Sequence, residues 1–319
     1  MGEFELIRQF FSSQAIARDD VVLGIGDDCA LLDLPVGESL AVTTDTLVSG
    51  IHFFPDVSPY ALGYKSLAVN LSDLAAMGAT PRWFSLAITL PQVETQWLSE
   101  FARGLSDLAS QFGVALIGGD TTRGPLSITI SAKGSVAAAS AIRRSGAQVG
   151  DDIWVTGHLG AAALGVQQRL KGLSFAADAM AYFQQAMEYP TPRCQFGQRM
   201  RGIASAMLDL SDGFAGDLNH ILKASQVSAC VELSQIPVHP LVLKVVSHEQ
   251  ALQLALGGGD DYELCFTASE QHRTLIQQIA AKEQLTVTCV GQVITGNAEI
   301  HWQHHQQPCE FIVRGWEHF

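Results

Sequence analysis

Aspartates gather beside glycines and threonines at the ends of short apolar segments, and this pattern limits the possible folds more than any other feature of the chain. Short apolar runs bounded by turn residues are typical of buried strands. In α/β folds ligands bind where strands end, and glycine lets the backbone approach them closely. We expect four acidic segments to follow a strand and a fifth to precede one: residues 24–28 (GIGDD), 43–46 (TTDT), 118–122 (GGDTT), 209–213 (DLSDG) and, before its strand, 257–261 (GGGDD).

The residue types in these segments indicate a magnesium site. Carboxylates and threonine hydroxyls are hard oxygen ligands, which Mg²⁺ prefers. For any single segment, aspartate beside glycine is also ordinary turn chemistry. Five such segments favour ligand binding, because converging carboxylates repel one another and a shared cation holds them together.

Asp73 differs from the other aspartates because it falls inside an apolar helix-like segment. An ionised carboxylate buried there needs a partner. Lys65 is two turns away, too far for an i,i+4 ion pair. Two interpretations stay open for Asp73: a metal ligand, or an exposed residue on the polar edge of the helix.

The arginine pair Arg143 and Arg144 and the histidine His52 each have more than one interpretation. Arg143 and Arg144 lie beside a glycine turn and suit phosphate oxygens, although this pair taken alone favours an exposed loop. His52 stands apart from any serine or cysteine nucleophile, which favours a structural or substrate-contacting role over a catalytic one.

Helix and strand signals alternate along all 319 residues, which predicts an α/β (α+β) chain of two domains. Ser58 and Pro59 are typical of a helix start, and Gly78 and Gly113 of helix ends. The small, polar residues 137–152 indicate a boundary, giving domains of residues 1–137 and 138–319. We expect strands at residues 21–25, 40–44, 82–90, 114–117, 126–136, 153–156, 206–208, 262–267 and 286–293, helices at 59–77, 94–112, 213–224, 238–256 and 270–282, helical segments between 161 and 205, and a solvated hairpin or loop at 301–307.

Composition excludes several classes of protein. The net charge is −13, and no basic block is present, which argues against nucleic acid as a partner. No apolar stretch is long enough to cross a bilayer, and the N-terminus lacks a signal-peptide pattern, so we expect no membrane association. The six cysteines form no CxxC pair and indicate reduced thiols, as in a cytoplasmic protein.

Taken together and in order, the motifs resemble the thiamine-monophosphate kinase family, over residues 4–319. That family belongs to the superfamily of aminoimidazole ribonucleotide synthetase. The motifs that carry the resemblance are GDD at 26–28, TTDTLV at 43–48, GIHF at 50–53, KSLAVNLSD at 65–73, GGDTT at 118–122, RSG at 144–146, DLSDG at 209–213 and DYEL at 261–264.

The resemblance implies a two-domain aminoimidazole ribonucleotide synthetase-like fold. The N-terminal domain would bind ATP and metal and contribute strands to a barrel-like interface of a homodimer. The C-terminal domain would complete the nucleotide and substrate sites, which lie between the two halves and across the dimer.

The same resemblance implies roles for individual residues. The ATP contacts would be Gly119, Asp120, Arg144 and Ser211. The thiamine monophosphate contacts would be His52, Glu263 and Trp316. Several Mg²⁺ ions would be bound by Asp28, Thr43, Thr44, Asp45, Asp73, Asp120, Asp209 and Asp212. One departure from the family pattern is Asp260, where a glutamate is more usual.

We therefore expect an enzyme that phosphorylates thiamine monophosphate to thiamine diphosphate by direct in-line attack on ATP. The acceptor phosphate is already ionised near neutral pH, so no general base or covalent nucleophile is required. Alternatives are a sister ATP-dependent synthetase, a non-catalytic Mg-nucleotide-binding protein that releases no ADP, and a phosphohydrolase that acts without an acceptor.

Overall fold

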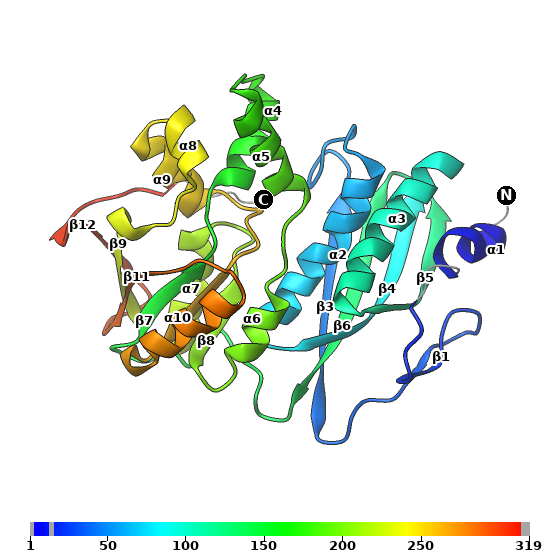
Figure 1. Cartoon of the computed structure of the whole chain (residues 1–319), viewed down its shortest axis with the longest axis horizontal. Helices are drawn as coiled ribbons and strands as arrows, with labels where there is room; N and C mark the ends of the chain where they lie inside the picture. The colour runs from blue at the N-terminus through cyan, green and yellow to red at the C-terminus, as the bar shows by residue number, and fades with distance from the viewer. Residues whose placement is uncertain (1–2, 13–15, 314–319) are drawn as a thin grey trace. The chain divides into compact units, whose positions relative to one another are not determined.

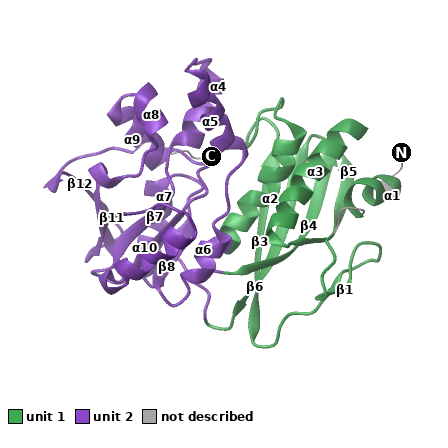
Figure 2. Ribbon diagram, viewed as in Figure 1, with its two compact units in different colours: residues 1–74, 79–139 green, residues 75–78, 140–319 purple. Residues whose placement is uncertain are grey.

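The computed structural model describes residues 3–12 and 16–313 and separates into two compact units (Figures 1 and 2). Unit 1 comprises residues 1–74 and 79–139. Unit 2 comprises residues 75–78 and 140–319. Each unit has its own sheet, which confirms the predicted two-part α/β (α+β) architecture.

Unit 1 is a four-stranded sheet with two long helices over one face (Figure 1). The strand order is β3-β6-β4-β5, and only the β4/β5 pair is parallel. The two helices approach each other closely, since a Cβ atom on Gly63 would lie 2.1 Å from the Phe101 carbonyl oxygen. The elements are α1 (Glu3–Leu6), η1 (Ile7–Phe11), β1 (Val21–Leu23), β2 (Leu31–Leu32), β3 (Glu38–Val48), α2 (Pro59–Ala76), β4 (Thr80–Leu90), α3 (Thr95–Phe112), β5 (Ala115–Arg123) and β6 (Ser127–Ala137).

Local signals fix the bounds of α2 and α3. Pro59 occupies the first position of α2, as predicted. Gly78 follows α2 with φ +64°, and Gly113 ends α3 with φ +64°, the left-handed conformation that glycine adopts without strain. Both predicted helices are confirmed.

The predicted ends of two strands in unit 1 are wrong. β3 continues to Val48 and β5 to Arg123, so Asp45 and Asp120 lie within strands and not after them. The reason is tertiary pairing: β3 bonds to β6 along all of its 11 residues, and β-branched threonines favour the extended backbone. The hydrogen bonds of continuous strand pairing outweigh the preference of glycine and aspartate for turns.

Unit 2 has a seven-stranded sheet of order β13-β12-β9-β11-β7-β10-β8, parallel only between β9 and β12. One face packs on α7 and α9 through an apolar cluster that includes Val155, Leu208 and Phe214. On the other face, Phe196 of α6 meets Phe266 of β10, with ring centroids 5.7 Å apart. The elements are β7 (Asp152–Thr156), α4 (Ala161–Lys171), α5 (Ala177–Glu188), α6 (Cys194–Arg199), β8 (Ala204–Asp209), α7 (Phe214–Ser225), β9 (Ser228–Glu232), η3 (Leu233–Gln235), α8 (Pro240–Val245), α9 (His248–Gly257), β10 (Leu264–Ala268), η4 (Glu270–His272), α10 (Arg273–Lys282), β11 (Val287–Ile294), β12 (Ile300–His304) and β13 (Gln307–Pro308).

In unit 2 the predicted strands at 153–156, 206–208, 262–267 and 286–293 are present, with ends that differ by one or two residues, and β9 was not predicted. β8 ends at Asp209, α7 begins four residues after Leu210, and the glycine-rich segment precedes β10. The single helix expected over residues 238–256 is wrong. It is two helices, because Ser247 and Gln250 form a capping box that starts α9 afresh. The His/Gln-rich residues 301–307 form the β12/β13 hairpin.

No helix in the described part of the chain is both long and apolar enough to cross a membrane.

Candidate functional site

Asp45 of β3 and Asp73 of α2 form a carboxylate pair in unit 1. The pKa of Asp45 is raised to about 6 by burial, by the charge of Asp73 and by a hydrogen bond with Asp73. The Thr43 hydroxyl donates a hydrogen bond to Asp73 Oδ2. The structure thus brings together three of the predicted metal ligands and excludes the interpretation of Asp73 as an exposed surface residue.

The surroundings of this pair fit a cation. Asn70 precedes Asp73 by three residues, which places both on one face of α2. Asn70 is fully buried, and its Oδ1 atom has no hydrogen-bond partner within the described residues. A buried carbonyl oxygen without a donor, on the helix face that carries Asp73, is the kind of hard oxygen ligand that Mg²⁺ prefers.

The other predicted ligands of unit 1 lie elsewhere. Across the four strands, Asp45 pairs with Ile130, Ile130 with Leu86, and Leu86 with Gly119, so Asp45 and Gly119 share one face of the sheet. Because successive residues of a strand point to opposite faces, Asp120 points to the face opposite Asp45. β3 and β5 are also the two edges of the sheet, three interstrand spacings or roughly 14 Å apart. Thr44 shares the face of Asp120, and Asp28 is exposed after β1, where its N–H donates to Asp27 Oδ1 at 2.8 Å.

Consequently, unit 1 does not bring its six predicted metal ligands together at one place. Within the described ranges, no three His, Cys, Asp or Glu side chains come together in a group that could hold a metal ion. In unit 1, the grouped predicted ligands are Thr43, Asp45 and Asp73.

Gly119, predicted to contact the nucleotide, has a structural reason to be glycine. A Cβ atom there would lie 1.8 Å from the Leu86 carbonyl oxygen of the neighbouring strand. At Gly118 a Cβ atom would meet nothing within 4 Å. Of these two adjacent positions, therefore, position 119 is the one where a side chain would collide with the neighbouring strand.

In unit 2 the acidic segments meet at one edge of the sheet. The Asp260 N–H donates to the Ser211 carbonyl at 2.9 Å, and the Tyr262 N–H donates to the Leu210 carbonyl at 2.8 Å. This approach requires glycine, since a Cβ atom on Gly259 would lie 2.3 Å from the Ser211 oxygen. The glycine-rich segment and the DLSDG segment are therefore one structural feature, which holds Asp209, Ser211 and Asp212 at the sheet edge.

Asp217, which was not predicted as a site residue, is hydrogen-bonded to the backbone of the DLSDG segment. Its Oδ2 atom accepts the Asp212 N–H at 3.0 Å, and its pKa is raised to about 7, chiefly by burial. The positive charge of Arg144 lowers the pKa of Asp217, which indicates that the guanidinium lies near the start of α7. Arg144, Ser211 and Asp212 thus share one neighbourhood. The sequence signal that could have identified Asp217 is its position as an acidic residue in the first turn of the helix that follows the DLSDG motif.

The Glu263 carboxylate accepts three hydrogen bonds from two side chains. Its Oε2 atom accepts hydrogen bonds from the Thr156 hydroxyl at 2.6 Å and from Arg193 Nε at 2.8 Å, and a terminal nitrogen of Arg193 donates to Oε1. Gly157 leaves room for the carboxylate, because a Cβ atom there would lie 1.9 Å from Oε1. The sequence analysis missed Arg193 and Thr156, since no motif links positions so far apart along the chain.

The remaining predicted substrate contacts are His52 and Trp316. The Nδ1 atom of His52 accepts the Val48 N–H at 3.0 Å, which places the ring proton on Nε2. Trp316 lies outside the described residues.

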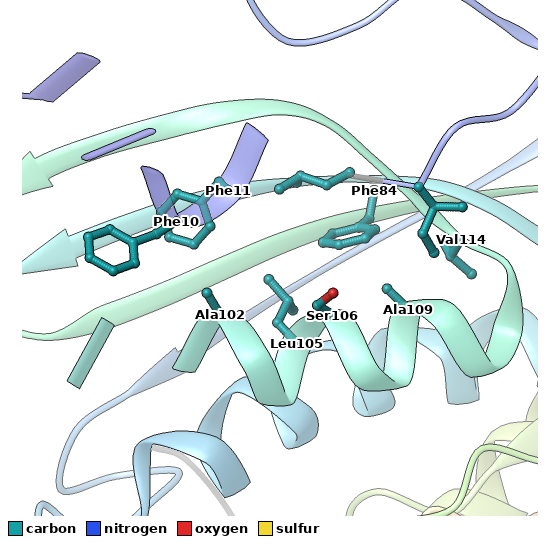
Figure 3. Close-up of a pocket in the computed structure, with 10 residues that line it drawn as sticks. Phe10, Phe11, Phe84, Ala102, Leu105, Ser106, Ala109 and Val114 are labelled. Carbon is teal, nitrogen blue, oxygen red and sulfur yellow. The ribbon is translucent and has the colours of Figure 1, made fainter. Parts of the chain in front are cut away.

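An apolar cavity in unit 1 is not part of either site (Figure 3). It lies under η1, and Phe10 and Phe11 face Leu105 of α3 across it. It contains no charged side chain, so it suits packing and not a phosphate.

Comparison with protein-family profiles defines the fold class of the chain. The profile of the AIR synthase related protein, N-terminal domain, matches residues 26–136, and that of the corresponding C-terminal domain matches residues 148–303. The chain therefore has the two-domain AIR synthase related fold.

Full-length relatives define the family within that class. Thiamine-monophosphate kinase of Salmonella typhimurium is 47% identical, with 100% of this chain and 98% of the relative covered. The crystal structure of thiamine-monophosphate kinase from Stenotrophomonas maltophilia has 42% identity and a TM-score of 0.88, over 97% of this chain and 98% of that one. The structure of AaThiL complexed with AMPPCP and TMP has 26% identity and a TM-score of 0.78, over 100% of this chain and 97% of that one. The chain belongs to the thiamine-monophosphate kinase family.

Proposed function

We propose that this protein phosphorylates thiamine monophosphate to thiamine diphosphate with ATP. The observation that carries the proposal is the 47% identity to a thiamine-monophosphate kinase over the whole chain, so that both units and every predicted site segment are included. The arrangement of acidic residues in each unit is consistent with it.

In the proposed reaction a phosphate oxygen of thiamine monophosphate attacks the γ-phosphorus of ATP in line. The new oxygen–phosphorus bond forms as the bond from the γ-phosphorus to the β,γ-bridging oxygen breaks, and ADP leaves with that electron pair. Because the attacking oxygen is already ionised, the protein needs only to position two anions and neutralise their charge. No residue is assigned as a general base or covalent nucleophile.

The chain's own residues would position the reactants. Gly119, Asp120, Arg144 and Ser211 would contact ATP, with Asp217 keeping the loop of Ser211 in place through the Asp212 N–H. His52, Glu263 and Trp316 would contact thiamine monophosphate. Arginine suits the phosphate oxygens of ATP because its fork of donors matches them.

Several Mg²⁺ ions would be held by the residues predicted from the resemblance: Asp28, Thr43, Thr44, Asp45, Asp73, Asp120, Asp209 and Asp212. When bound, Mg²⁺ would reduce repulsion between the two phosphate groups and stabilise charge on the transferring group. The raised pKa of Asp45 supports this assignment, because it marks a carboxylate that is buried and also repelled by its neighbour Asp73.

A homodimer through unit 1 would explain two features. β3 is an edge strand of 11 residues in unit 1 and pairs with β6 along one side, and its Leu40 and Val42 are 49% and 58% exposed. Long apolar edges are normally covered. A second copy of the chain could also supply the ligands that the pair of Asp45 and Asp73 lacks.

We also place the enzyme in the cytoplasm. All six cysteines are free thiols, which suits a reducing compartment.

The direct test is incubation of the purified protein with ATP, Mg²⁺ and thiamine monophosphate, followed by chromatography for thiamine diphosphate. Control reactions omit Mg²⁺ or replace the acceptor with free thiamine. Product in the complete mixture alone is the expected result. ATP binding without product would favour a binding protein, and free phosphate without an acceptor would favour a hydrolase.

A further inference from the structure

Glu263 is fixed more firmly than a surface contact residue needs to be. Its side chain is 8% exposed, and that of its partner Arg193 is 23% exposed. Two nitrogens of Arg193 bond to the two carboxylate oxygens, and Thr156 bonds to one of them. Such a two-point arginine pair fixes the plane of the carboxylate as well as its position.

The backbone around Arg193 is itself restrained. Pro190 and Pro192 precede it, and its carbonyl accepts the Gly197 N–H at 2.8 Å in the first turn of α6. The Thr156 hydroxyl also accepts the Leu264 N–H at 2.8 Å, which ties the residue after Glu263 to the end of β7. Both partners of Glu263 are therefore anchored, Thr156 at the end of the interior strand β7 and Arg193 at the N-cap of α6.

A cluster of aromatic rings adjoins this carboxylate. Tyr182 stacks on His239 with ring centroids 4.0 Å apart, and His158 meets His239 edge-on at 5.0 Å. His158 follows Gly157, on which the Glu263 carboxylate rests, and the charge of Glu263 acts on both His158 and Tyr182. Burial lowers the pKa of both histidines, so the cluster is uncharged at neutral pH.

These features suit the organic end of thiamine monophosphate and not its phosphate. The guanidinium of Arg193 is already paired with Glu263, and Asp261 is a second acidic group close by, so this place offers a phosphate little positive charge. A fixed carboxylate accepts hydrogen bonds, and the aminopyrimidine ring carries an amino donor. Flat, uncharged side chains provide a surface on which a heteroaromatic ring can stack.

We propose that Arg193 is the positioning residue that orients Glu263 to accept a hydrogen bond from the amino group of the substrate pyrimidine, beside a wall formed by Tyr182 and His239. This inference rests on the proposed function. It adds that specificity for the pyrimidine depends on Arg193, a residue that would not itself touch the substrate.

The test compares two arginines that each make a two-point ion pair. R193A and R193K remove or weaken the pair with Glu263. R273A is the matched control, because Arg273 pairs in the same way with Asp152 at the other end of β7. Steady-state kinetics are measured with thiamine monophosphate and with the analogue that carries a carbonyl oxygen in place of the pyrimidine amino group.

We expect R193A to raise KM for thiamine monophosphate about 10- to 100-fold, with kcat and KM for ATP changed less than about threefold, because a misplaced acceptor weakens binding of one substrate. Wild-type protein should prefer the amino substrate over the analogue by at least about 100-fold, and R193A should lose most of that preference. R273A should keep wild-type KM and preference, even where its thermal stability falls.

Two results separate the inference from the function on which it rests. A wild-type protein that forms no thiamine diphosphate would refute both. Active wild type together with an R193A variant whose KM and preference match those of R273A would overturn the inference alone. If R193A does not fold, R193K decides the question by the same preference ratio, since lysine keeps the charge and loses the two-point geometry.

Discussion

Asp45 of β3 and Asp73 of α2 lie against each other in unit 1, and burial together with the charge of Asp73 raises the pKa of Asp45 to about 6. The pair is costly to the metal-free protein near neutral pH, because one carboxylate must ionise beside another. Such a cost is characteristic of sites that gain their stability from a bound ligand.

The first prediction concerns D45N in metal-free protein at pH 7.5. Removing one of two repelling charges should raise the free energy of unfolding by about 1–3 kcal/mol, given about 1.4 kcal/mol for each unit of pKa shift. The same variant should lose most kinase activity. Urea unfolding and the thiamine diphosphate assay measure the two effects. D33N, at an exposed position, should change stability by less than about 0.5 kcal/mol. Near-normal turnover in D45N would reject its role in metal binding.

The second prediction is a pH dependence of stability through Asp217, whose pKa is raised from 3.8 to about 7. Between these values the folded state holds a proton that the unfolded state has released, so stability should fall as pH rises from 4 to 7. The unfolding free energy of the wild type minus that of D217N should decrease by about 2–4 kcal/mol over this window. The subtraction cancels the contribution of Asp45, and a difference that stays flat would contradict the assignment.

The third prediction separates two adjacent glycines of β5. A Cβ atom at position 119 would collide with the Leu86 carbonyl oxygen at 1.8 Å, whereas one at position 118 would meet nothing within 4 Å. G119A should therefore lower the free energy of unfolding by about 2–4 kcal/mol by disrupting β4/β5 pairing, and G118A by less than about 1 kcal/mol. Equal effects in urea unfolding would show that the close approach of the strands is not what requires glycine.

The fourth prediction tests the dimer. L40E places a charge on the exposed apolar edge of β3, where Leu40 is 49% exposed. If a second copy covers that edge, L40E should yield monomers in sedimentation velocity at concentrations where the wild type is dimeric, because a buried unpaired charge is strongly unfavourable. L275E, on α10 of unit 2 at a leucine of 41% exposure, is the control and should leave the assembly unchanged. A monomeric wild type would exclude the proposed interface.

The sequence alone determined the features that depend on neighbouring residues. Helix α2 begins at Pro59 and ends before Gly78, and α3 ends at Gly113, as these residues predict, because caps act over a single turn. The DLSDG segment follows β8 and precedes α7, as its composition indicates. The order of acidic motifs also led to the correct family, since motif order is itself a property of the sequence.

Only the tertiary structure decided which side chains meet. Asp45 pairs with Asp73 and is separated from Asp120, because strand pairing extends β3 and β5 beyond their local signals and turns alternate residues to opposite faces. Arg193 reaches Glu263 because β7, β10 and the start of α6 converge, and no local pattern encodes that contact. Capping acts within a few residues, whereas register, facing and ion pairing depend on residues that lie far apart along the chain and are brought together by packing.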